Sequence, residues 1–91
     1  MLNEVQRNKF NIRAKETIQK LLKELKIVKL NDDNVCDLQN ELDLRVSSLV
    51  SMQEDGETID DKLLEIYDLL VDIVLDNEEN IDFLNQLFLN W

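Results

Sequence analysis

The sequence of 91 residues has no histidine, no proline, one glycine and one cysteine. With no proline and with Gly56 as the one glycine, the chain lacks the turn residues that hairpins need, which excludes an all-β fold. With no histidine, it lacks an imidazole base, a Ser-His or Cys-His dyad and a histidine metal ligand. These absences indicate a helical protein that is not an enzyme.

The remaining chemistry is equally sparse. An EF-hand loop around Gly56 needs acidic or amide ligands where the chain has Ser51, Gln53 and Lys62. A phosphate cradle needs several glycines. Cys36 lies beside Asp37, and a negative neighbour disfavours the thiolate that a nucleophilic cysteine requires. We therefore assign no catalytic residue, no cofactor and no metal ligand, and interpret Cys36 as a small, semi-buried helical residue.

The compartment follows from two further absences. Cys36 has no partner for a disulfide, which favours a reducing environment. The N-terminal residues lack the apolar segment of a signal peptide, and the longest apolar-rich stretch, residues 63–75, is shorter than the roughly 20 residues of a membrane span. We expect a cytoplasmic protein.

Charge is abundant and uneven. The chain has 20 acidic and 10 basic residues, for a net charge of −10. Residues 1–30 have a net charge of +5, and residues 31–91 have a net charge of −15. Either the basic segment docks on the acidic remainder, or the acidic remainder is presented to a basic partner. Direct nucleic-acid binding is not expected, because neutralisation of phosphates drives such binding.

Apolar residues recur at helical spacing along the chain. We predict an all-α fold with a single domain, residues 1–91, built as an antiparallel four-helix bundle. The predicted helices cover residues 3–29, 33–54, 59–76 and 78–90. The apolar stripe of the first helix is Phe10, Ala14, Ile18, Leu21, Leu25 and Val28, and that of the second is Val35, Leu38, Leu42, Val46, Leu49 and Met52.

Helix boundaries are marked by capping residues. Gly56 is the natural stop for the second helix. Thr58 offers an N-cap to the third helix, with Asp61 at capping-box spacing. Residues 31–34, which are Asn and Asp throughout, are suited to start the second helix.

The predicted third helix is apolar on all sides except one. Its acids step by four, three, four and four residues, so they share a narrow stripe, which we call the acidic stripe and consider a partner-binding surface. The acidic stripe consists of Asp61, Glu65, Asp68, Asp72 and Asp76. A helix of this kind is either central in the bundle or covered on a second face by another chain.

The predicted fourth helix offers a second candidate surface. Phe83, Leu87, Phe88 and Trp91 are large apolar residues, and tryptophan is enriched at binding hot spots. They either pack on the bundle or contact a partner.

Two stretches between about residues 14 and 70 share a pattern with one known family. They are Ala14-x-x-x-Ile18-x-x-Leu21-Leu22-x-x-Leu25-Lys26 before Asn31-Asp32-Asp33, and Leu42-Asp43-Leu44-Arg45-Val46-Ser47-Ser48 before Asp55-Gly56 and Lys62-Leu63-Leu64-Glu65. This pattern resembles the pediocin-like (class IIa) bacteriocin immunity proteins. The resemblance implies a small cytoplasmic four-helix bundle that recognises a bacteriocin-occupied membrane sugar permease from the inside, without catalysis.

Three hypotheses about function stay open, and all have the protein act by binding another protein. The first is an immunity-type protein that uses the apolar C-terminal helix. The second is a phage-encoded inhibitor, of the anti-defence or anti-CRISPR type, whose acidic stripe mimics nucleic acid toward a nucleic-acid-processing enzyme. The third is a homo-oligomeric assembly component that associates through residues 59–76. The source is bacterial or phage under the first two hypotheses.

Overall fold

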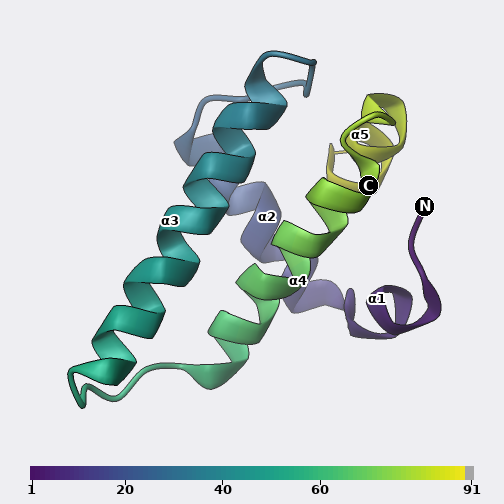
Figure 1. Ribbon diagram of the computed structural model, residues 1–91. Coiled ribbons are helices and arrows are strands. Elements are labelled where there is room, and N and C mark those ends of the chain that lie inside the picture. Colours follow the sequence, from purple (N-terminus) through teal and green to yellow (C-terminus); the bar gives the residue numbers. More distant parts are fainter. Residues whose placement is uncertain (90–91) are drawn as a thin grey trace.

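A computed structural model of the chain describes residues 1–89. Within that range the structure is all-helical, which confirms the predicted class, and it forms one compact unit (Figure 1). The helices are α1 (Glu4–Lys9), α2 (Ile12–Glu24), α3 (Asn34–Glu54), α4 (Asp61–Asn77) and α5 (Ile81–Leu89). The described part therefore has five helices instead of the four predicted, and the four-helix bundle arrangement is not confirmed.

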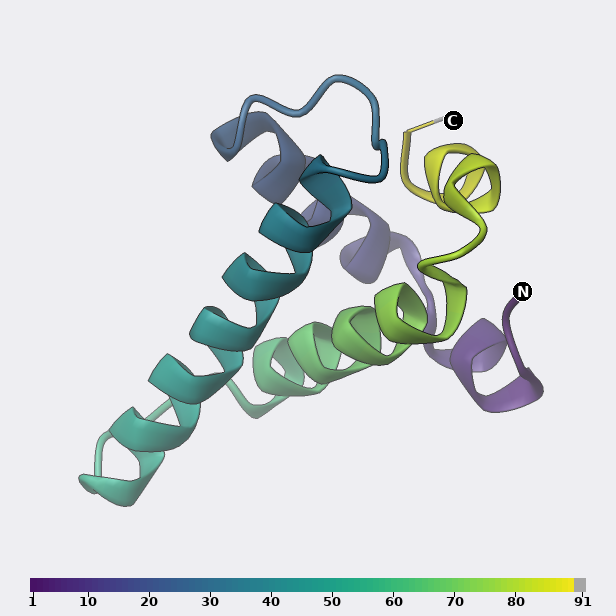
Figure 2. The same ribbon diagram turned by 45° about the horizontal axis from the view of Figure 1, so that its top comes forward.

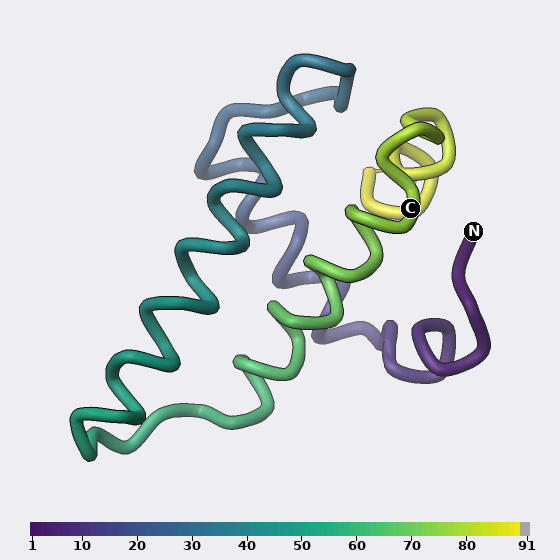
Figure 3. Tube along the Cα trace, viewed as in Figure 1, coloured from purple at the N-terminus to yellow at the C-terminus, as the bar shows by residue number. Residues whose placement is uncertain are grey.

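The prediction of one continuous helix over residues 3–29 was wrong. Phe10 leaves the helical conformation, with φ −79° and ψ 76°, and Asn11 then caps a new helix by accepting a hydrogen bond from the Ala14 amide at 3.0 Å. Asn3 caps the short preceding helix in the same way. Asparagine competes for backbone amides, so it favours a helix start over a helix interior. The chain changes direction at this break (Figure 3).

Helix α2 also ends five residues earlier than expected. Lys26 has a positive φ of 60°, and the Ile27 amide donates to the Leu22 carbonyl at 2.9 Å, as in a Schellman motif. The register of the predicted apolar stripe is lost after this point. Val28 is consequently 92% exposed, and Leu30 is buried in its place.

The boundary between α3 and α4 was predicted in part. Gly56 ends α3 as expected, with φ 84° and a hydrogen bond from the Glu57 amide to the Met52 carbonyl. Thr58 does not cap α4, however. Asp60 is the N-cap, because its side chain accepts from the amides of two residues in the first turn of α4.

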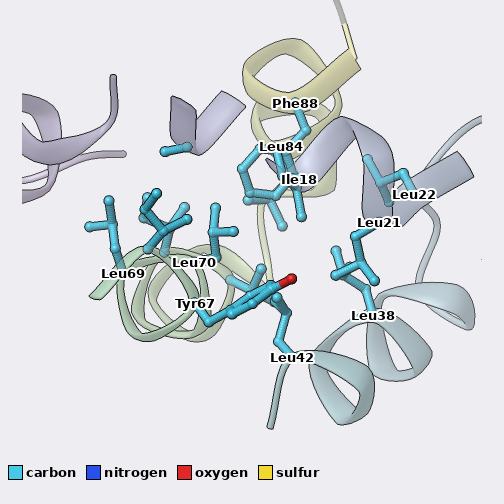
Figure 4. Close-up of a cluster of buried hydrophobic side chains, with 14 of the residues drawn as sticks. Ile18, Leu21, Leu22, Leu38, Leu42, Tyr67, Leu69, Leu70, Leu84 and Phe88 are labelled. Atoms are coloured by element: carbon cyan, nitrogen blue, oxygen red, sulfur yellow. The ribbon is translucent and has the colours of Figure 1, made fainter. Parts of the chain in front are cut away.

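Helix α4 is the central element, as one of the two sequence interpretations predicted. It lies along α3 and also contacts α1, α2 and α5. The core forms where these helices meet, and side chains from four of them point into one cluster in Figure 4. Its labelled members are Ile18, Leu21 and Leu22 of α2, Leu38 and Leu42 of α3, Tyr67, Leu69 and Leu70 of α4, and Leu84 and Phe88 of α5.

A polar network at Arg45 joins three of the helices. The Arg45 guanidinium donates to Glu24 of α2 at 2.7 Å, to Glu41 of α3 at 3.1 Å and to the Tyr67 hydroxyl of α4 at 3.2 Å. Partial burial disfavours the arginine charge, but these three hydrogen bonds outweigh burial and raise the pKa of Arg45 above its ordinary value. The network fixes α2 and α3 relative to α4.

Candidate partner-binding surface

The structure brings the five residues of the acidic stripe together as the sequence predicted. All five are exposed on α4, on the side opposite the buried Leu70 and Val74. At a rise of 1.5 Å per residue, the stripe from Asp61 to Asp76 is about 22 Å long. The helix that carries it is held by packing against four neighbours, so the acids have a rigid support.

Helix α1 borders one side of the acidic stripe. The Gln6 side-chain amide donates to the Asp76 carboxylate at 2.7 Å, and Gln6 itself is buried. Between α1 and α4 lies an open cleft of about 320 Å³, whose walls include Glu65, Asp68, Asp72 and Asp76. The hydrogen bond from Gln6 holds the Asp76 carboxylate in position relative to α1.

Basic residues gather at the other end of the stripe. A second open cleft, of about 350 Å³, is lined by Lys9, Arg13 and Lys62 together with Glu65. Charge is therefore more balanced at the beginning of α4 than at its C-terminal half. The most strongly acidic part of the stripe is formed by Asp68, Asp72 and Asp76.

A basic side chain of the N-terminal segment, that of Arg13, forms an ion pair with an acid of the remainder, Asp60. The Arg13 guanidinium, in the first turn of α2, donates at 2.5 Å to the carboxylate of Asp60, which is the N-cap of α4. The hydrogen bond from Arg13, with a second from the Leu63 amide, holds the pKa of Asp60 below its ordinary value. This contact is of the kind that the docking interpretation of the charge asymmetry predicts.

Of the four residues proposed as the apolar C-terminal surface, one packs on the bundle and two are partly exposed. Phe88 is completely buried, and its ring packs against Phe10 with 6.0 Å between the ring centroids. Phe83 and Leu87 are half-buried, and Trp91 lies outside the described residues. Phe88 thus follows the packing alternative and not the partner-contact alternative, because α5 closes the core over α2 with this residue.

Sequence reasoning missed an apolar row that runs beside the acidic stripe. Leu64, Val71 and Leu75 are spaced seven and four residues apart on α4, which puts them on one helix face. Leu75 is 43% exposed, and the other two residues are half-buried. The sequence does contain this pattern, since α4 is apolar on every side but one. The predictions for this helix, however, concerned only whether the whole helix is central in the bundle or covered by another chain, and did not single out this row.

Metal-ligand groups and membrane-spanning helices are both absent from the described part of the chain. Residues 1–89 contain no group of three or more Asp, Glu or Cys side chains placed to hold a metal ion. None of the helices in that range has both the length and the apolar character needed to cross a bilayer. Cys36 is exposed, contrary to the expected half-burial.

Comparisons with known proteins do not identify a family for this chain. No family model, no curated protein and no solved structure matches the chain. The immunity-protein resemblance accordingly stays a prediction. What the surface offers chemically is a line of carboxylates, which accept hydrogen bonds and attract cations, next to an apolar row.

Proposed function

We propose that the protein binds a basic surface of another protein through the acidic stripe, and that it thereby inhibits a nucleic-acid-binding protein. The observation that supports this proposal most is the alignment of five exposed acids on the central helix. The proposal corresponds to the second of the three hypotheses. It places the protein in the cytoplasm, where such a target works.

The spacing of the acids agrees with mimicry of a single nucleic-acid strand. One strand of duplex DNA has a phosphate every 3.4 Å along its axis, so a length of about 22 Å holds about six or seven phosphates. The acidic stripe has five carboxylates over the same length. Both strands together would supply about 13 charges, so the stripe is too sparse to imitate a whole duplex.

The immunity-type hypothesis draws less support from the geometry. It relied on an apolar C-terminal helix, and the burial of Phe88 removes one of its four contact residues. Expression of the protein in bacteriocin-sensitive cells tests it separately, because an immunity protein protects such cells.

Displacement of DNA tests the proposed function directly. Proteins of a bacterial lysate are first bound to immobilised DNA, and the purified protein is then added at low and at high salt. We expect release of particular DNA-binding proteins at low salt, with release falling steeply as salt rises, because the contact is electrostatic. The released proteins are then purified and assayed singly for competition.

Two variants with equal net charge make the assay specific. In the stripe variant, the five acids become Asn or Gln: Asp61→Asn, Glu65→Gln, Asp68→Asn, Asp72→Asn and Asp76→Asn. In the matched control, five exposed acids elsewhere are neutralised: Asp32→Asn, Asp33→Asn, Glu54→Gln, Asp55→Asn and Glu57→Gln. The stripe variant is expected to release nothing, and the control to act like the parent. Equal loss in both variants would contradict the proposal.

A further inference from the structure

The apolar row of α4 continues across to α3 as one outward face. Helices α3 and α4 run antiparallel, and α2 lies behind them in Figure 1. Arg45 of α3 contacts Tyr67 of α4. In an antiparallel pair, moving along α3 from Arg45 to Val50 corresponds to moving back along α4 from Tyr67 to its first turn, so Val50 lies at the level of the first turn of α4, next to Leu64 in the sequence of that helix.

This outward face remains open in the structure. Val50 is 36% exposed, and Val46, one turn earlier on the same side of α3, is half-buried. Figure 2 shows the C-terminal end of α3 standing apart from α2 and α5. With Leu64, Val71 and Leu75, the two valines form what we call the α3–α4 face. Its row on α4 spans 11 residue steps, or about 16 Å, which is the length of about three helical turns.

Acids lie within and beside the α3–α4 face. Asp68 is one turn after Leu64 and one turn before Val71, so it falls inside the apolar row. Asp72 lies one turn after Asp68 on α4. On α3, Asp43 lies on the same side as Val46 and Val50. An occupant must cover apolar side chains and supply cations at the same time.

A second copy of this chain that presents the same face meets only the first of these conditions. In a two-fold symmetric dimer the same patch faces itself, so Asp68 and Asp72 of each copy would oppose the same acids of the other. Like charges placed across an interface disfavour association, and the chain has a net charge of −10. Charge complementarity therefore favours a basic occupant.

We propose that the α3–α4 face binds a cationic amphipathic helix of about three turns, supplied by the partner protein. Its apolar side covers Leu64, Val71 and Leu75, and its Lys or Arg residues pair with Asp68 and Asp72. This inference rests on the proposed function, since it names the partner element that the acidic stripe meets. It adds an apolar contact that charge mimicry alone does not require.

Two synthetic peptides serve as probes. Both have about 18 residues of leucine, lysine and alanine in identical composition. In one, the leucines recur at helical spacing on one side, and in the other the order is scrambled so that no apolar side forms. Affinity for each is measured by fluorescence anisotropy at two salt concentrations. The amphipathic peptide is expected to bind roughly tenfold more tightly than the scrambled peptide.

Matched variants locate the contact. Val50→Ser together with Leu75→Ser removes apolar side chains from the α3–α4 face. The control, Val28→Ser together with Leu44→Ser, removes two side chains that are 92% and 65% exposed elsewhere. The first variant is expected to lose the tenfold preference for the amphipathic peptide, and the control to keep it. Circular dichroism verifies that both variants are folded.

The outcomes separate this inference from the proposed function. If both peptides bind parent and face variant equally, and the stripe variant binds neither, the inference is overturned and the proposed function stands. If the stripe variant binds both peptides as well as the parent does, the proposed function fails, and the inference that rests on it fails too. A dimer in sedimentation that the Val50→Ser and Leu75→Ser changes abolish would identify a second copy as the occupant and overturn the inference.

Discussion

The two sides of α4 have opposite compositions. The inner side, which includes Leu70, Ile73 and Val74, is completely buried against the neighbouring helices. The outer side consists of the acidic stripe and the partly exposed row that ends at Leu75. One helix thus forms the centre of the core and the most distinctive surface of the molecule.

The difference between the two sides of α4 separates the residues that stabilise the fold from those that are candidates for recognition. Burial of apolar surface stabilises the fold, and it is concentrated on the inner side. Lines of like charge on a helix oppose folding slightly, so repulsion among the acids of the stripe works against stability, although Asp76 accepts a hydrogen bond from Gln6. A surface that stability does not explain is a candidate for recognition, and the following predictions test this division.

The largest expected effect comes from the inner side. Leu70→Ala leaves a cavity in the core and is expected to lower the free energy of unfolding by about 3 kcal/mol. Leu75→Ala makes the same substitution on the outer side and is expected to lower the free energy of unfolding by less than about 1 kcal/mol. Urea denaturation measures both. Equal losses would show that the two sides do not differ in their contribution to stability.

A smaller loss is expected where the inner side meets polar groups. Arg45→Ala removes the three hydrogen bonds to Glu24, Glu41 and Tyr67, and is expected to cost about 1–2 kcal/mol. Glu41→Gln, which alters one partly exposed pair within α3, should cost about 0.5 kcal/mol or less. Denaturation of the two variants side by side decides whether Arg45 joins the helices, and an Arg45→Ala protein as stable as the parent would refute it.

The outer side is expected to respond with the opposite sign. Neutralising the five acids of the stripe removes four like-charge pairs at spacings of three or four residues along α4, which should raise the free energy of unfolding by about 1 kcal/mol at low salt. The gain should shrink as salt rises, because salt screens exposed charges. Thermal melts at two ionic strengths measure it. A marked loss of stability would mean that the stripe serves the fold.

The smallest effect concerns the end of α4. Asp60→Asn keeps a good N-cap but loses the charge that pairs with Arg13. Because the pKa of Asp60 is lower in the folded protein, its charge stabilises the fold above the ordinary aspartate pKa of about 3.9. That contribution is lost as pH falls through the lowered pKa. The melting temperatures of parent and variant should therefore differ at neutral pH and converge in acid, and a difference independent of pH would contradict this.

Helix ends were predictable where one residue type alone suits the backbone. Gly56 takes the positive φ that ends α3, as glycine does most readily. Lys26 also has a positive φ at the end of α2, but a lysine in the sequence does not predict a positive φ. The break at Asn11 was hidden because apolar residues on either side keep their helical spacing across it.

The candidate site also has one part that the sequence predicted and other parts that it did not. The acidic stripe followed from spacing alone, because exposed acids on a helix keep their order in any fold that buries the opposite side. The burial of Phe88 against Phe10 did not, since it depends on how α5 meets α2 in space. The apolar row of Leu64, Val71 and Leu75 depended on knowing which face of α4 the other helices leave uncovered.

A map of the bound peptide on the protein tests the central claim most directly. The amphipathic peptide is titrated into isotope-labelled protein, and the shifts of the backbone amide signals are recorded by NMR. The account predicts that the largest shifts lie in α4 between residues 61 and 76 and in α3 between residues 43 and 50. Shifts confined to α5, or spread evenly over acids such as those of residues 31–37 and 54–57, would contradict it.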